Sequence, residues 1–93
     1  MMSTNTFQNI LRLPKDVSDE MSMGNRGYHM DGTIVLGVFD DELWEQCVYW
    51  HEVGHLERGD NEREAWLFAL TRLPKDLPFK YKRKMIKCIR SYL

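Results

Sequence analysis

A run of β-branched and apolar residues over positions 33–39 gives the clearest strand pattern in the chain. Asp31-Gly32 precedes it, and this dipeptide is typical of a two-residue turn between antiparallel strands. Residues 27–30 stand before the turn and can form the partner strand. The pattern therefore predicts a β-hairpin over about residues 27–39.

Two weaker segments precede the hairpin, after a polar start at residues 1–6. Residues 7–11 are predicted to form a short helix that ends before Pro14, because proline disfavours helix in the residue before it. Residues 15–27 contain many turn-forming residues and are predicted to be a loop.

Helical spacing of apolar residues begins after the hairpin. Asp40 or Asp41 can cap a helix whose apolar positions continue to Leu56, and Gly59 suits its C-terminal cap. Acidic residues fill the first turn of this segment, where they interact favourably with the helix dipole.

Two further helices are expected. Asp60 or Asn61 can cap a helix over residues 62–73, which are rich in helix-forming residues and end before a proline. Pro78 can open a last helix over about residues 79–92.

These elements predict a single small α+β domain spanning residues 1–93. A β-hairpin or short antiparallel sheet would pack on the helix that follows it, with two more helices beyond. The chain has 93 residues, 43% hydrophobic and 12% aromatic, which suits a globular protein and excludes a disordered one. A chain this short buries only about 60–65% of its unfolded surface, so a bound metal would support a thin core.

Cysteine content and the length of apolar runs indicate in which cellular compartment the protein is expected. Two cysteines, Cys47 and Cys88, are too few for a disulfide scaffold. Residues 1–20 lack a basic start followed by an apolar stretch, so no signal peptide is expected. No apolar run approaches the ~18 residues of a membrane span. We therefore expect a cytoplasmic protein with reduced thiols and no membrane partner.

Charge is unevenly distributed along the chain. The net charge is −1, but residues 1–76 carry −7, and residues 77–93 carry +6 with no acidic residue. In the predicted helix over 79–92, one largely apolar stripe comprises Lys82, Met85, Ile86, Ile89 and Leu93. Three roles stay open for this basic helix: docking on the rest of the protein, binding a nucleic acid or protein partner, or covering an active-site cleft.

The most informative motif is H-E-V-G-H at residues 51–55. On a helix, His51 and His55 lie on one face about one turn apart and can offer two ring nitrogens to one Zn²⁺. Glu52 follows the first histidine and can take a proton from water beside the metal. The motif therefore supplies two candidate zinc ligands and a candidate general base.

A catalytic zinc usually has three protein ligands, so a third is expected from another element. The turn at residues 59–61 reverses the chain, and the first turn of the next helix can then face the metal. Glu62 is favoured, because its i+3 neighbour Ala65 is small and leaves space on that face. Glu64 is the alternative, and Asp60 is less favoured because it can serve as the helix cap.

Other conspicuous side chains near the motif are interpreted as packing residues. Cys47 lies one turn before His51, and we expect a core cysteine because free cysteine is among the most buried residue types. The three tryptophans, Trp44, Trp50 and Trp66, are expected to pack in or against the core.

H-E-V-G-H is followed, after a short gap, by E-R-E-A-W-L-F-A and a Leu-Pro pair. This stretch, about residues 44–74, resembles the ImmA/IrrE-like metallopeptidases, which combine H-E-x-G-H with a downstream E-x-x-A…F-A segment and a terminal Leu-Pro. The resemblance implies Glu52 as the catalytic base and three zinc ligands, His51, His55 and Glu62.

The resemblance also implies a minimal gluzincin-like domain of the zincin type. It further implies a peptidase that acts on a specific protein such as a regulator, by analogy with peptidases that cleave repressors. Two features depart from the family pattern. Only six residues separate His55 from Glu62, and Trp66 stands where the family commonly has Asn.

The expected activity is zinc-dependent hydrolysis of a peptide bond with Glu52 as general base. The outer strand of the hairpin can hold an extended substrate by main-chain pairing. Tyr28 and His29 on that strand are candidates for stabilising the oxyanion, and ordinary strand roles fit them as well. The alternative function is a non-catalytic, metal-stabilised interaction module that binds nucleic acid or a protein partner through the basic helix.

Overall fold

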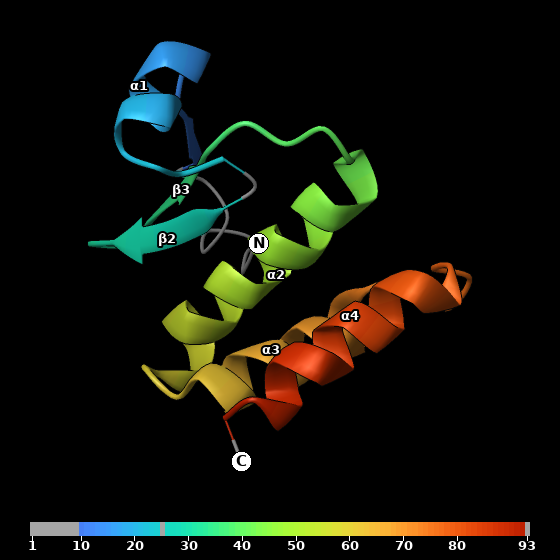
Figure 1. Cartoon of the computed structure of the whole chain (residues 1–93). Coiled ribbons are helices and arrows are strands. Elements are labelled where there is room, and N and C mark those ends of the chain that lie inside the picture. The colour runs from blue at the N-terminus through green and yellow to red at the C-terminus, as the bar shows by residue number, and fades with distance from the viewer. Residues whose placement is uncertain (1–9, 25, 93) are drawn as a thin grey trace, which may run out of the picture.

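The computed structural model describes residues 10–24 and 26–92, and within them the chain forms four α-helices and one three-stranded sheet (Figure 1). The α+β class is therefore confirmed. In chain order the elements are β1 (Ile10–Arg12), α1 (Lys15–Glu20), β2 (Gly27–Met30), β3 (Thr33–Leu36), α2 (Glu42–Arg58), α3 (Glu62–Arg72) and α4 (Phe79–Arg90).

The predicted hairpin is formed by β2 and β3, which pair antiparallel with Tyr28 opposite Val35. Asp31 and Gly32 both have positive φ, 51° and 80°, as a type I′ turn requires. The strand after the turn ends at Leu36, so the paired part of the hairpin is shorter than predicted.

The short helix predicted over residues 7–11 is wrong where the structure describes it. Ile10 and Leu11 lie in β1, which pairs in parallel with β3, whereas residues 7–9 lie outside the described part of the chain. The strand order is β1-β3-β2, so the sheet is mixed rather than antiparallel. Pairing of Ile10 with Ile34, which is distant in sequence, decided the conformation of this segment.

The loop predicted over residues 15–27 is wrong in part, because its first six residues form α1. Lys15 and Asp19, one helical turn apart, form an ion pair of 2.7 Å between Nζ and Oδ2. Ser18 is fully buried, and its hydroxyl accepts a hydrogen bond from the backbone N–H of Val38 at 3.3 Å. This contact fixes α1 against the segment that leaves β3.

The three longer helices agree closely with the predicted ones. Asp41 caps α2, and Gly59 ends it. Asn61, rather than Asp60, caps α3 and accepts a hydrogen bond from the backbone N–H of Glu64 at 3.0 Å. None of the helices within residues 10–24 and 26–92 combines the length and the apolar character needed to cross a membrane.

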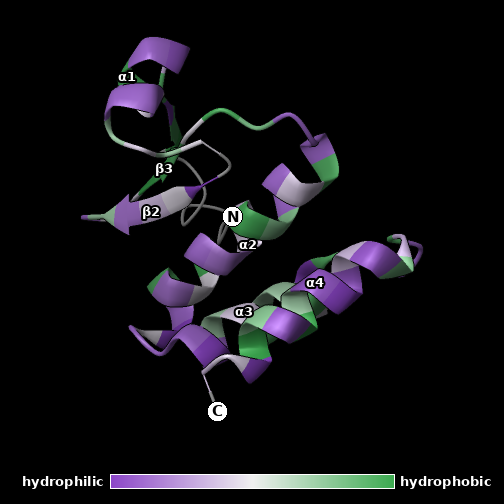
Figure 2. Cartoon of the chain, in the orientation of Figure 1, coloured by the Kyte–Doolittle hydropathy of each residue, from purple (hydrophilic) through white to green (hydrophobic). Residues whose placement is uncertain are grey.

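The central element is α2, which has the sheet on one side and α3 and α4 on the other (Figure 1). β3, the middle strand, is mostly hydrophobic, whereas α1 is mostly hydrophilic (Figure 2). The core lies around α2 and takes side chains from both sides, among them Ile34, Leu36, Cys47, Val53, Trp66, Phe68 and Met85.

α4 packs against α3 and α2, which it meets through buried Tyr81 and Met85. Ile86, part of the predicted apolar stripe, is 43% exposed, so the buried side of α4 does not coincide with that stripe. Leu93, the last residue of that predicted stripe, lies outside the described residues. The hydroxyl of Tyr81 donates to Oδ2 of Asp41 at 2.5 Å, which ties α4 to the start of α2.

Candidate metal centre

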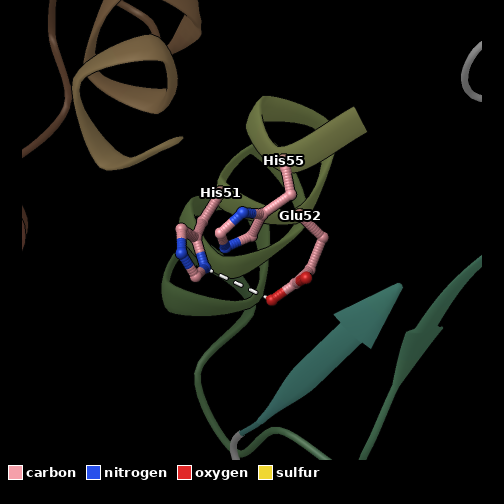
Figure 3. Close-up of side chains that lie close together, drawn as sticks. All are labelled: His51, Glu52 and His55. Atoms are coloured by element: carbon pink, nitrogen blue, oxygen red, sulfur yellow. Dashed lines mark ion pairs between the residues drawn. The ribbon is translucent and has the colours of Figure 1, made fainter. Parts of the chain in front are cut away.

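The H-E-V-G-H motif lies in the second half of α2, where its helical spacing brings three polar side chains together. His51, Glu52 and His55 are each less than a tenth exposed, although they are polar. Their potential ligand atoms lie within 4.8 Å of one another. Figure 3 shows that the three side chains converge from α2, with the Glu52 carboxylate directed toward the sheet.

Glu62, at the first position of α3, lies beside the two histidines, although it is not one of the three residues whose ligand atoms cluster within 4.8 Å. Its Oε1 lies 2.9 Å from Nε2 of His51, and its Oε2 lies 3.2 Å from Nε2 of His55. Atoms bound to one tetrahedral zinc at about 2.0–2.1 Å are about 3.3 Å apart. The two distances from Glu62 to the predicted ligands His51 and His55 are therefore close to those between the ligand atoms of a zinc site.

Gly54, the fourth residue of the motif, allows α3 to come this close to α2. A Cβ at position 54 would lie 2.6 Å from the carbonyl oxygen of Ala65 and 2.9 Å from its Cα. Ala65 is itself fully buried. We predicted that the small side chain of Ala65 leaves room on the metal-facing side of α3, and the backbone of α2 occupies that room.

The ring orientations of the two histidines are fixed by neighbours outside the predicted ligand set. Nδ1 of His55 donates to the carbonyl oxygen of Gly59 at 2.9 Å, which leaves its Nε2 directed at Glu62. The ring of His51 stacks on Trp66, with centroids 4.0 Å apart and planes 8° from parallel. These contacts hold each Nε2 atom beside one carboxylate oxygen of Glu62.

When both are neutral, the two histidines have fewer N–H donors than there are oxygens facing them. His51 faces Glu52 at Nδ1, 3.2 Å away, and Glu62 at Nε2, while His55 faces Gly59 and Glu62. All four partner atoms are oxygens that accept, whereas a neutral imidazole has one N–H to donate. A metal ion between the two Nε2 atoms and Glu62 would let both rings stay neutral, so the donor set fits a metal.

Glu52 occupies a different place from Glu62, on the side of the site that faces β2. His29 of β2 lies with Nδ1 3.1 Å from Oε1 of Glu52, and its ring stacks on His55 with centroids 4.9 Å apart. Burial acts to raise the pKa of Glu52, but hydrogen bonds from His51 and His29 and the nearby histidine charges outweigh it. The pKa of Glu52 therefore lies below its usual value, so this group is a carboxylate at neutral pH.

The remaining candidate residues have other surroundings. Glu64, the alternative third ligand, points to Arg63, whose Nε lies 3.8 Å from its Oε2. Cys47 is fully buried in the core, and burial raises the pKa of its thiol to about 11, as the core interpretation requires. Asp60 does not cap α3 but lines the cleft in front of the site.

Two hollows open beside the site. The first, which we call the metal-site cleft, has a volume of about 450 Å³ and is bordered by β2 through Tyr28 and His29. The second, which we call the apolar hollow, has a volume of about 340 Å³ and includes Trp44, Val48 and Trp66. Both hollows reach His51, Glu52 and Glu62, so the site is accessible from two directions.

Sequence reasoning missed the contributions of Trp66 and Gly59. Trp66 was expected only to pack, and it does pack, but it also carries the ring of His51. Its position four residues after Glu62, on the same face of α3, was the signal that could have revealed this. The contact of His55 with the carbonyl oxygen of Gly59 has no signal in the sequence, because every residue has a backbone carbonyl.

No protein-family model matches the chain, and neither a curated protein nor a solved structure matches it. The resemblance of residues 44–74 to the ImmA/IrrE-like peptidases therefore stays a prediction made from the motifs.

Proposed function

We propose that the protein is a zinc-dependent metallopeptidase of the ImmA/IrrE-like kind, with a minimal zincin-like arrangement. The observation that carries the proposal is the carboxylate of Glu62, which reaches Nε2 of both His51 and His55 while no N–H is available for both contacts in neutral rings. Two imidazoles and one carboxylate are a donor set found in catalytic zinc sites. We therefore assign Zn²⁺ as the cofactor.

Zn²⁺ bound by these residues would supply a lowered pKa for water and polarisation of a substrate carbonyl. His51 and His55 hold their Nε2 atoms in place through Trp66 and Gly59, so little reorganisation is needed for binding. The remaining open side faces the metal-site cleft, where a peptide can enter.

Glu52 has the position and the charge state of a general base. Its carboxylate is buried and lies 3.2 Å from Nδ1 of His51, whereas Glu62 contacts the Nε2 atom of that ring. It accepts the proton of the attacking water and can return it to the leaving amine. His29 holds one of its oxygens and so orients the carboxylate toward the cleft.

The edge of the sheet beside the cleft suits an extended substrate. In the described sheet, β2 pairs with β3 on one side only, and Tyr28 and His29 border the cleft. A peptide can add to that edge through main-chain hydrogen bonds. The hydroxyl of Tyr28 is then a candidate to stabilise the oxyanion, whereas Nδ1 of His29 is engaged with Glu52.

The replacement Glu52→Gln tests this assignment. We expect the variant to keep its zinc and to lose peptide hydrolysis by about 10²–10⁴-fold, because an amide cannot take up the proton. The measurement is cleavage of a peptide library from a whole-proteome digest, read by mass spectrometry. Glu64→Gln, on the neighbouring helix and away from the Nε2 atoms, is the matched control and should cleave normally. Equal cleavage by the Glu52→Gln variant and the wild type would refute the proposal.

The preference for a specific protein such as a regulator follows from the family resemblance and belongs to this proposal. The cytoplasmic setting inferred from the two cysteines and the N-terminal sequence also belongs to it. A second candidate function is a metal-stabilised interaction module. One observation favours it: Phe79 is 64% exposed on α4, next to Arg83. In a module of that kind, Glu52→Gln would alter neither metal content nor partner binding.

A further inference from the structure

Three hollows follow one another across the surface, starting from the candidate metal centre. The metal-site cleft and the apolar hollow share Gly27, His51, Glu52 and Glu62. The apolar hollow in turn shares Cys88 and Ser91 with a shallow hollow along α4. We call this third hollow the basic face, and it is formed by Lys80, Arg83, Lys84, Lys87, Cys88 and Ser91.

The apolar hollow is built for a large hydrophobic side chain. Trp44 and Trp66 stack with ring centroids 5.8 Å apart, and Val48 lies beside them. All three are buried, and the hollow of about 340 Å³ that they border opens directly onto Glu52 and Glu62. A side chain next to the reacting bond could therefore bury aromatic or branched apolar surface here.

Two cations of the basic face lie over aromatic rings. Lys84 lies with its Nζ 3.9 Å from the centroid of Trp44, and Arg83 lies over Phe79 at 5.1 Å. Residues 77–93 contain six basic residues and no acidic one. Lys84 also joins the two hollows, because the ring it covers belongs to the apolar hollow.

We propose that the peptide bound at this site has a large apolar residue beside the scissile bond and acidic residues further along on the same side. The apolar side chain fills the apolar hollow, and the acidic side chains lie on Lys84, Lys87 and Arg83 of the basic face. The position of the apolar residue beside a scissile bond rests on the proposed peptidase function. Docking of the peptide requires only the three hollows.

Continuity of the three hollows favours an acidic peptide over a nucleic acid. A chain leaving the metal-site cleft through the apolar hollow arrives at Cys88 and Ser91, between the cations. A duplex has no extended backbone that could enter the metal-site cleft and the apolar hollow at once. The attraction between the acidic side chains of the peptide and the cations of the basic face gives the binding its specificity. It also makes the affinity depend on the salt concentration.

Binding is measured with the Glu52→Gln protein, so that no probe is cleaved. The probes are short fluorescein-labelled peptides with one central Phe: one has Asp and Glu on its N-terminal side, one has them on its C-terminal side, and a third has Asn and Gln instead. We expect one acidic peptide to bind about tenfold more tightly than the amide version, with the difference shrinking at high salt.

Charge reversal at Lys84 and Lys87, as Lys84→Glu/Lys87→Glu, should abolish this preference. Lys80→Glu/Lys87→Glu is a second variant, because it leaves Lys84 on the ring of Trp44. Lys75→Glu/Arg90→Glu changes the net charge by the same amount outside the basic face and is the matched control. It should bind as tightly as the parent protein.

Each outcome decides a separate point. Equal binding of the acidic and amide peptides, or a preference unchanged by charge reversal, would overturn the inference even if peptide hydrolysis is established. Binding of a labelled duplex DNA through Lys84 and Lys87, without the peptide preference, would overturn it in favour of a nucleic acid. A charge-dependent peptide preference without hydrolysis by the wild type would support the docking surface and count against the peptidase function.

Discussion

At the scale of single residues, Glu62 and Glu64 give the sharpest contrast. Both lie in the first turn of α3, two residues apart, but only the Glu62 carboxylate reaches the two histidine Nε2 atoms. We expect Glu62→Gln to weaken zinc binding by about two orders of magnitude, and Glu64→Gln to leave it unchanged. Competition with a chromophoric chelator measures both affinities. Loss of affinity in the Glu64 variant instead would transfer the ligand role to that residue.

Gly54 offers a test of the contact between helices. We expect Gly54→Ala to destabilise the protein by roughly 1–3 kcal/mol, because its Cβ would overlap the backbone of Ala65. Gly24→Ala is the matched control, since a Cβ there meets nothing within 4 Å. Urea unfolding monitored by tryptophan fluorescence gives both free energies. Equal stability of the two variants would mean that α2 and α3 are not held this closely.

The sequence was sufficient to locate His51, Glu52 and His55 because their arrangement is set by one helix and a spacing of four residues. The sequence favoured Glu62 as the third ligand but could not decide between it and Glu64, because the approach of Glu62 to the histidines depends on how α3 packs against Gly54. The contact between His29 and Glu52 could not be predicted, because His29 lies on a strand distant in sequence and no local sequence pattern specifies the pairing.

At the scale of elements, Asp41 links two helices. It caps α2 and also accepts the hydrogen bond from Tyr81 of α4, which lowers the pKa of its carboxyl below the ordinary 3.8. Because the folded-state pKa is the lower one, the carboxylate stabilises the fold above about pH 4, and this contribution is lost as the pH falls through the folded-state pKa.

We therefore expect Asp41→Asn to lower the melting temperature at neutral pH and to lower it less at acidic pH. Thermal unfolding followed by circular dichroism from neutral pH to about pH 2.5 measures this. Asp40→Asn, one residue earlier, is the control, and Tyr81→Phe should reproduce part of the effect. A loss of stability that is the same at every pH would contradict the role assigned to the Asp41 charge.

The elements that the sequence predicted are those specified locally. The hairpin turn has a strong signal in Asp31-Gly32, and α2 and α3 have their caps and periodic apolar residues. β1 was missed because three exposed residues acquire strand structure only by pairing with β3. The buried side of α4 was misjudged since Tyr81, with its hydroxyl on Asp41, was not recognised as an inward residue.

At the scale of the whole molecule, the candidate metal centre joins the two sides of the protein. α2 contributes two candidate ligands, α3 a third, and β2 the residue that contacts Glu52. A metal bound there would connect elements around a small core, and binding to the folded state alone stabilises it. The stability of the entire protein should therefore depend on zinc.

Zinc at a hundredfold excess over its dissociation constant should add about 2.7 kcal/mol to the free energy of unfolding. For a chain of this size, the melting temperature should rise by roughly 10 °C or more. Differential scanning fluorimetry with zinc, with magnesium and with a chelator measures the shift. The Glu62→Gln variant should respond much less than the wild type, and an equal response of both would assign the effect to zinc bound elsewhere.

The central claim is that His51, His55 and Glu62 hold one zinc ion, and the zinc content of the purified protein tests it most directly. After exhaustive dialysis, elemental analysis should give about one zinc per chain for the wild type, as a three-ligand site requires. A folded protein that holds no zinc and takes up none when zinc is added would contradict the claim, and with it the proposed peptidase.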